Sequence, residues 1–177
     1  MNNHFPVRTL TTTGLLLAVG LLLPFLFHSL VGSSGGRMLL PMHYGVLIGG
    51  LLLGPVAGAF LGIATPLLST VLTGMPAMPV LPPMVVELVV YGIAAGLARR
   101  QFHATVLWSL LLAMMAGRVA LGLAVAVLGP AIGLDARPVV YVMTSITAGL
   151  PGIAAQLVFI PLLLARGRLE HLVEGRA

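Results

Sequence analysis

The sequence predicts an all-α integral membrane protein, a bundle of six transmembrane helices, and three observations lead to this fold class. Of the 177 residues, 59% are hydrophobic and only 7% are charged, whereas roughly a quarter of a soluble domain is charged. The mean hydropathy is +1.11. The apolar runs are continuous over roughly 15 to 25 residues, as membrane helices need, whereas barrel strands would alternate over about ten.

Six apolar segments, separated by turn residues, define the expected helices of a single membrane domain over residues 1–177. Gly54-Pro55 makes a tight break between the second and third helices, because proline cannot continue a helix but suits a helix start. The stretch 74–83 is too rich in proline for a helix, and Pro151 should kink the last helix. The expected bounds are about 9–31, 38–53, 56–73, 84–98, 104–128 and 139–165.

The arginines indicate which way the bundle faces. Six spans leave both termini on one side of the membrane, and most arginines fall on that side, so the positive-inside rule predicts cytoplasmic termini. The first segment lacks a small-x-small cleavage site and is expected to be retained rather than removed as a signal peptide. Topology explains the net charge of +5, and no nucleic-acid partner is expected. The arginines are Arg8, Arg99, Arg100, Arg166, Arg168 and Arg176 on the terminal side, and Arg37 and Arg137 on the other.

The chain lacks the motifs of most enzymes. It has no Cys, so it offers no disulfide or thiolate site. It has no His-Glu-x-x-His, no Gly-x-Ser-x-Gly and no Walker loop, so neither catalysis nor ATP hydrolysis by this chain is expected. The five histidines are scattered over segments on opposite faces, which argues against a metal site. No cofactor is expected in this chain.

Glu87 and Arg118 are the two charged residues within the expected spans, where a charge costs at least a few kcal/mol unless it is paired or hydrated. At about 1.5 Å per residue, Arg118 lies roughly 15 Å below the outer surface and Glu87 about 5 Å below it. A direct salt bridge that only fixes packing is one interpretation. Polar groups lining a ligand pocket are the other, and the Met/Pro stretch just before Glu87, which resembles a lid, favours it.

Other side chains in the outer half are weaker candidates for the same pocket. Tyr91 lies four residues after Glu87, on the same helix face. A hydrogen bond from His43 to a backbone carbonyl is a simple alternative to ligand binding, and methionines fill gaps as readily as they contact ligands. Gln156 and His28 are interpreted as helix-to-helix hydrogen bonds. The predicted substrate-binding residues are His43, Tyr44, Met75, Met78, Glu87, Tyr91, Arg118, Tyr141 and Thr144.

Small residues recur four apart in several helices, which lets helix backbones approach closely in a bilayer. Internal packing is the simpler interpretation for most of them. Gly14 and Ala18 in the first helix are flanked by leucines and could instead form a flat surface for a partner protein. The other recurring positions are Gly45 and Gly49, then Gly50, Gly54, Gly58 and Gly62, and finally Gly92 and Gly96.

Several short motifs, in this order and spacing, resemble the substrate-specific S components of energy-coupling factor (ECF) transporters. The resemblance spans about residues 15–118, and the length and helix number agree over the rest of the chain. The motifs are Leu40-Pro41-Met42-His43-Tyr44-Gly45, Gly50-Leu51-Leu52-Leu53-Gly54-Pro55, Thr65-Pro66-Leu67-Leu68, Thr73-Gly74-Met75-Pro76 and Glu87-Leu88-Val89-Val90-Tyr91-Gly92.

The resemblance implies a six-helix vitamin-binding protein in the plasma membrane of a prokaryote. Its outward-facing pocket would be closed by the loops after the first, third and fifth helices. Such components dock through small residues of the first helix onto a transmembrane coupling protein bound to two ATPases, which use the ATP, and they topple to release substrate inside. Gly14 and Ala18 match the docking pattern, with Gly in place of the usual first Ala.

The sequence therefore predicts capture of a water-soluble vitamin or precursor, with the Met/Pro stretch as a lid. Arg118 would suit a ligand carboxylate and Glu87 a cationic or hydroxyl-bearing ligand, so the substrate stays open. One alternative is a stand-alone secondary transporter, which would need inverted repeats that are not evident. A membrane-embedded enzyme or assembly factor is another, but the sequence offers it no nucleophile.

Overall fold

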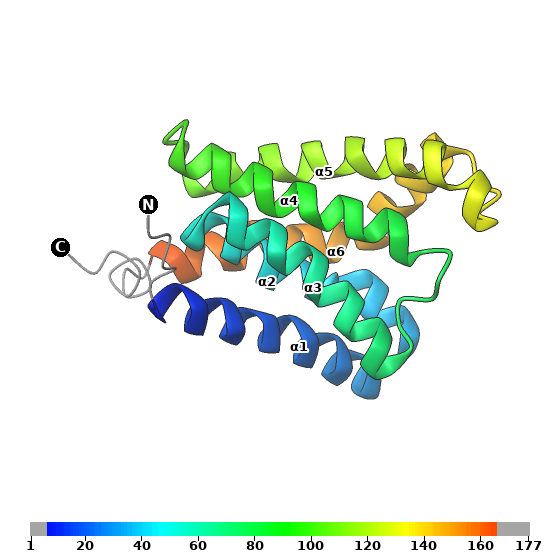
Figure 1. Ribbon diagram of the computed structural model, residues 1–177, viewed down its shortest axis with the longest axis horizontal. Helices are drawn as coiled ribbons and strands as arrows, with labels where there is room; N and C mark the ends of the chain where they lie inside the picture. Colours follow the sequence, from blue (N-terminus) through cyan, green and yellow to red (C-terminus); the bar gives the residue numbers. More distant parts are fainter. Residues whose placement is uncertain (1–6, 166–177) are drawn as a thin grey trace.

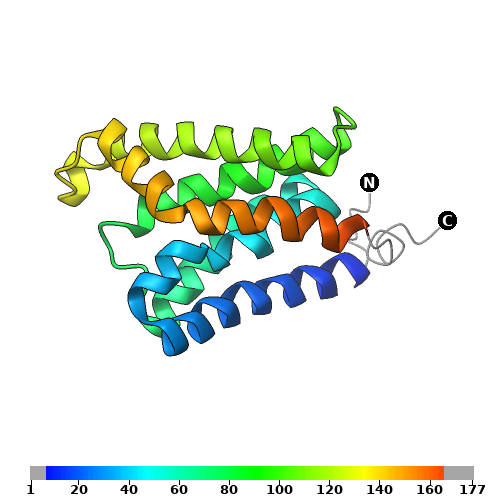
Figure 2. The same cartoon turned by 180° about the vertical axis from the view of Figure 1, so that it is seen from behind.

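The computed structural model describes residues 7–165, although the side chains of residues 27–39 are outside its description. Over this range the chain forms six α-helices and one 3₁₀ helix, with no strand. Figures 1 and 2 show the helices packed side by side in one bundle. The elements are α1 (Val7–Leu39), α2 (Pro41–Leu53), α3 (Pro55–Thr73), α4 (Leu81–Arg100), α5 (Val106–Leu128), η1 (Pro130–Ile132) and α6 (Pro138–Ala165).

Three predicted boundaries were wrong: the end of α1, the start of α2, which is Pro41 rather than residue 38, and the start of α4. Helix α1 continues through the stretch 32–37, which was expected to be a flexible loop. Gly and Ser are weak helix formers, so the composition of this stretch had predicted a break between helices. The break comes at Leu40, whose φ of 48° is left-handed, directly before Pro41. Helix α4 begins at Leu81 rather than near residue 84, because a first turn tolerates prolines.

Five of the helices in the described range are long and apolar enough to cross a membrane, which makes the chain a multi-pass membrane protein. The thirteen residues of α2 rise only about 20 Å, against a hydrocarbon core of roughly 30 Å. The start of α1 and the end of α6 lie at one end of the bundle, beside the α2–α3 and α4–α5 turns (Figures 1 and 2). Six full spans with cytoplasmic termini stay a prediction.

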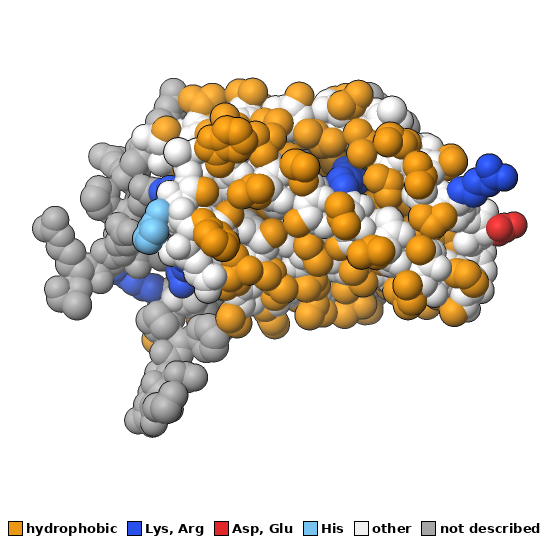
Figure 3. Space-filling model, turned by 90° about the horizontal axis from the view of Figure 1, so that it is seen from above, with side chains coloured by type: hydrophobic (Ala, Val, Ile, Leu, Met, Phe, Trp, Pro, Cys, Tyr) orange, Lys and Arg blue, Asp and Glu red, His pale blue; other side chains and the backbone are white. Residues whose placement is uncertain are grey.

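The exterior of the bundle is apolar. Figure 3 shows hydrophobic side chains covering most of the visible face, with charged side chains at the two ends and one basic side chain within the apolar face. Large hydrophobic residues point outward from several helices, among them Val71, Met115, Val127 and Val139, each at least 69% exposed. Such a surface is unstable in water and matches the acyl chains of a bilayer.

Close packing of glycines holds the centre of the bundle together, which confirms the internal-packing interpretation for α2, α3 and α4. A Cβ atom on Gly50 or on Gly58 would lie 2.5 Å from the carbonyl oxygen of Gly92. A Cβ on Gly62 would lie 2.6 Å from the backbone nitrogen of Val89. The three helices therefore touch backbone to backbone, which side chains larger than hydrogen would prevent.

Gln156 joins α6 to the junction between α1 and α2. Its side-chain Nε2 donates to the carbonyl oxygen of Leu40 at 3.3 Å, and the residue is 1% exposed. The predicted role of Gln156 in a hydrogen bond between helical segments is confirmed. A similar hydrogen bond was predicted for His28, but its side chain lies outside the described part of the structure.

Replacing Gln156 with Leu, which has nearly the same volume, should lower the free energy of unfolding by about 1 kcal/mol. The Leu40 carbonyl would lose its side-chain donor, while the space would stay filled. Thermal unfolding in detergent, followed by tryptophan fluorescence or by aggregation, measures the change. Leu163→Ala is the control, because this α6 side chain is 49% exposed. An unchanged melting temperature for Gln156→Leu would contradict the prediction.

Candidate functional site

Glu87 in α4 and Arg118 in α5 form an ion pair inside the bundle. Arg118 Nη1 lies 2.9 Å from Glu87 Oε1, and the two side chains are 11% and 6% exposed. The two charges thus pair with each other, and the ligand-binding role of both residues stays a prediction. The difference in depth estimated from the sequence was too large. Helix α4 begins three residues earlier than expected, which moves Glu87 inward, and the long arginine side chain spans the rest.

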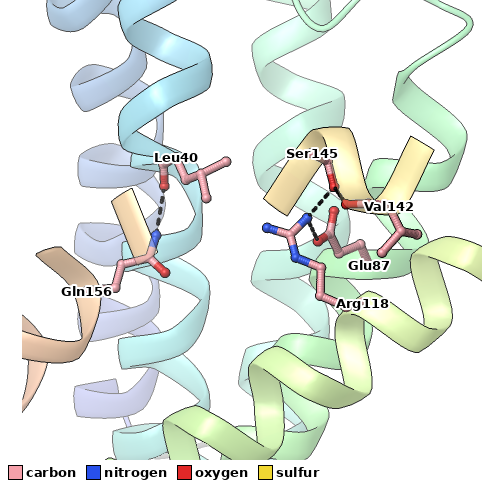
Figure 4. Close-up of polar contacts among 6 residues, drawn as sticks. All are labelled: Leu40, Glu87, Arg118, Val142, Ser145 and Gln156. Carbon is pink, nitrogen blue, oxygen red and sulfur yellow. Dashed lines mark hydrogen bonds and ion pairs between the residues drawn. The ribbon is translucent and has the colours of Figure 1, made fainter. Parts of the chain in front are cut away.

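Ser145 of α6 completes the ion pair, and sequence reasoning missed it. Arg118 Nη1 donates to Ser145 Oγ at 2.8 Å, and Ser145 Oγ donates to the Val142 carbonyl at 2.9 Å (Figure 4). A serine within a helix often bonds its own preceding turn, so its presence alone indicates little. Ser145 lies four residues after Tyr141, which places both on the same helix face. This spacing was the one signal that could have identified Ser145 from the sequence.

Tyr91 and His43 extend this group of polar side chains toward α2. The Tyr91 hydroxyl is hydrogen-bonded to the Glu87 carboxylate, as its position one turn later suggested. The rings of His43 and Tyr91 meet edge to face, with centroids 5.3 Å apart and an angle of 68°. Both are buried, at 3% and 2% exposure. We call the five residues His43, Glu87, Tyr91, Arg118 and Ser145 the polar cluster; they come from four helices.

The hydrogen-bonding capacity of the polar cluster is not all used. The two ring nitrogens of His43 are buried and have no hydrogen-bond partner within the part of the chain that the structure describes. The Leu40 carbonyl lies near the ring, but it accepts the His43 backbone N–H, at 3.1 Å, and has no hydrogen-bond geometry with either ring nitrogen. Arg118 Nη2 is likewise buried without a partner among the described residues.

The remaining predicted substrate-binding residues differ in how deeply they are buried. Tyr44 is half-buried and packs against the core, and Tyr141 is half-buried in α6. Thr144 is exposed. Met75 and Met78 are 44% and 66% exposed. Their roles in binding stay predictions.

The Met/Pro segment after α3 is fixed to the end of that helix. Ser69 Oγ donates to the carbonyl oxygen of Met75 at 2.8 Å, and Thr70 Oγ1 donates to that of Pro76 at 3.1 Å. Helix α3 thus positions the segment at the end of the bundle opposite the start of α1 (Figure 1). Its predicted action as a lid remains a prediction.

A hollow of about 410 Å³ lies apart from the polar cluster, between the end of α5, η1 and the start of α6. Asp135 is its single charged lining residue. The described residues hold no group of three or more His, Asp or Glu side chains able to bind a metal ion. The lining residues are Val125, Ala126, Gly129, Pro130, Gly133, Leu134, Asp135, Ala136 and Pro138.

Two small residues of α1 face outward. Gly14 and Ala18 are both exposed, and a Cβ atom built on Gly14 would meet no atom within 4 Å. By contrast, a Cβ on Gly20, further along α1, would lie 3.0 Å from Thr65 of α3. The surface around Gly14 is therefore free to receive another helix.

An apolar helical bundle whose interior brings charged, aromatic and hydroxyl groups together from four helices is typical of membrane transport proteins that recognise a small solute. The sequence matches the family described as the ECF transporter, substrate-specific component, over residues 8–164. The match covers most of the chain, so this protein belongs to that family, and it is a substrate-specific transporter subunit rather than an enzyme. Comparisons with curated proteins and with solved structures gave no match.

Proposed function

We propose that this protein captures a water-soluble vitamin or vitamin precursor at the outer face of a prokaryotic plasma membrane. It delivers the molecule inward as part of an ATP-driven importer. The family supplies the role of a substrate-specific subunit. The observation that carries the proposal further is the polar cluster, a set of buried groups at the centre of an otherwise apolar bundle.

The unused hydrogen-bonding capacity of the polar cluster supports ligand binding over a purely structural role. Buried polar groups that serve only packing are nearly always hydrogen-bonded, because an unmade bond costs roughly 1–3 kcal/mol. Arg118 Nη2 and the His43 ring depart from this rule within the described chain. A bound solute with matching polar atoms would satisfy them.

The energy source in this proposal is external to the chain. A transmembrane coupling protein and two ATPase subunits would bind the subunit, and those subunits would hydrolyse the ATP. The exposed face of α1 around Gly14 and Ala18 is the surface proposed for the coupling protein, since small residues allow a partner helix to approach closely.

Native mass spectrometry of the detergent-purified protein tests the proposal. The subunit should be released with a vitamin-sized molecule whose accurate mass identifies it. An empty protein that also binds no vitamin in titration would contradict the proposal. Uptake in the absence of any ATPase would then indicate a secondary transporter, and product formed from a lipid would indicate an enzyme.

The double variant Gly14→Leu/Ala18→Leu should lose docking but keep substrate capture. Nothing lies within 4 Å of a Cβ on Gly14, so the larger side chain fits the isolated subunit while preventing close approach of a partner helix. Co-purification of the coupling protein and ATPases should fall at least about tenfold, given the usual cost of losing an interface core.

Val119→Leu is the matched control for this variant, because it enlarges a side chain that is 64% exposed on α5. It should leave co-purification unchanged. Native mass spectrometry of the double variant should still detect the bound molecule. Undiminished co-purification of the double variant would exclude this face of α1 as the docking surface.

A further inference from the structure

The two terminal nitrogens of the Arg118 guanidinium group have different surroundings. Nη1 donates to Ser145 at 2.8 Å and forms the ion pair with Glu87 at 2.9 Å, although Glu87 Oε1 has no hydrogen bond among the described residues. Nη2 is buried and has no partner among the residues that the structure describes. One nitrogen is therefore held by α4 and α6, while the other presents two desolvated N–H donors that need an acceptor.

Resting on the proposed function, we propose that Arg118 Nη2 is the donor that recognises the transported molecule, and that it binds an uncharged acceptor such as a carbonyl oxygen or an aromatic ring nitrogen. Glu87 and Ser145 are then positioning residues. They hold the guanidinium plane through Nη1 and leave Nη2 for the ligand; Figure 4 shows the hydrogen bond to Ser145 and the ion pair with Glu87.

The charge balance of the cluster favours an uncharged acceptor over a carboxylate. Glu87 and Arg118 lie in direct contact and cancel each other's charge. A carboxylate bound to Nη2 would add a second negative charge beside Glu87 in a buried site, and buried charges without their own partner are strongly disfavoured. A carbonyl or ring nitrogen accepts the same hydrogen bonds without adding a charge.

His43 indicates a second polar atom on the ligand. Its ring is 3% exposed, and neither nitrogen has a partner within the described part of the chain. A neutral imidazole offers one donor and one acceptor. Tyr91 connects the two ends of the site, since it packs against the His43 ring and bonds to Glu87. A heteroaromatic ring with a carbonyl or an amide substituent carries this combination of groups.

The variant Arg118→Lys separates ligand recognition from the ion pair. Lysine keeps the positive charge beside Glu87. Its single nitrogen lacks the planar, forked geometry of the guanidinium group, so it cannot bond to Glu87, Ser145 and a ligand at the same time. Native mass spectrometry should show the small molecule in the wild type and in the control Thr147→Ala, which alters an exposed residue of α6. The occupancy of Arg118→Lys should be at least tenfold lower.

The outcomes of this experiment are distinct. Equal occupancy of the wild type and Arg118→Lys would overturn the role of Nη2 and leave the proposed function standing. A wild type that carries no small molecule and binds none from a vitamin mixture would instead overturn the proposed function, and this inference with it.

The variant Glu87→Gln tests the charge of the bound group. Titration calorimetry would use the molecule identified by mass in the wild type and ligand-free protein of both forms. For an uncharged acceptor, removing the Glu87 charge loosens the guanidinium, and the affinity should fall three- to tenfold. For a carboxylate, removing the neighbouring negative charge should tighten binding at least tenfold, and this result would overturn the inference.

Discussion

Replacing Arg118 with Met should lower the free energy of unfolding by about 3–5 kcal/mol, the usual cost of removing one member of a buried ion pair. The expected loss of stability arises because Glu87 would remain buried without its partner. Glu87 is 6% exposed, and without Arg118 its carboxylate would keep only the hydrogen bond from Tyr91. Ser145 would lose its donor as well. Thermal unfolding in detergent should show a fall of several degrees in the melting temperature.

The double variant Glu87→Gln/Arg118→Met shows whether the cost arises from the uncompensated charge. A neutral glutamine can remain buried at far lower cost than an unpaired carboxylate, so the double variant should regain most of the lost stability. Both variants should fail to bind the transported molecule. Equal melting temperatures for the single and double variants would mean that lost packing, and not charge, explains the effect.

Replacing Gly92 with Val should prevent the bundle from assembling. A Cβ atom at position 92 would lie 2.7 Å from the Cα of Gly58, so the atoms in its way belong to the α3 backbone and cannot move as a side chain can. Helices α3 and α4 would have to separate, and the core residues Leu61 and Leu88, both fully buried, would lose contacts. We expect a cost of at least about 3 kcal/mol, the upper range for overpacking.

Fluorescence-detected size-exclusion chromatography measures this effect as the loss of a monodisperse peak. Gly122→Ala is the matched control, because the nearest atom to its Cβ is a side-chain carbon of Val142 at 3.4 Å, an ordinary contact. The control should keep the wild-type peak. A monodisperse Gly92→Val protein with an unchanged melting temperature would contradict the backbone contact.

The sequence predicted the helix ends well where a long apolar run is bounded by turn residues. Apolar periodicity and turn residues gave the ends of α3, α5 and α6 to within two residues. The extension of α1 through residues 32–37 was missed because glycine and serine have low helix propensities, which predict a break where the structure has a continuous helix.

The candidate site was predicted less completely than the fold. Glu87 and Arg118 could be found because a charge inside an apolar run is rare and costly. Ser145 could not, because its role depends on how α6 is rotated against α5, and periodicity within one helix does not define that rotation. Nor did the sequence show that one guanidinium nitrogen is engaged while the other is unused.

The open surface at Gly14 has a consequence for the energetics of assembly. In the isolated subunit, lipid acyl chains must cover the surface formed by Gly14 and exposed neighbours such as Leu10 and Leu15. A docking helix would return those lipids to the bulk membrane, and van der Waals packing and lipid entropy would then provide the driving force. Association through this surface would thus respond to acyl-chain order and membrane composition, and hardly at all to ionic strength.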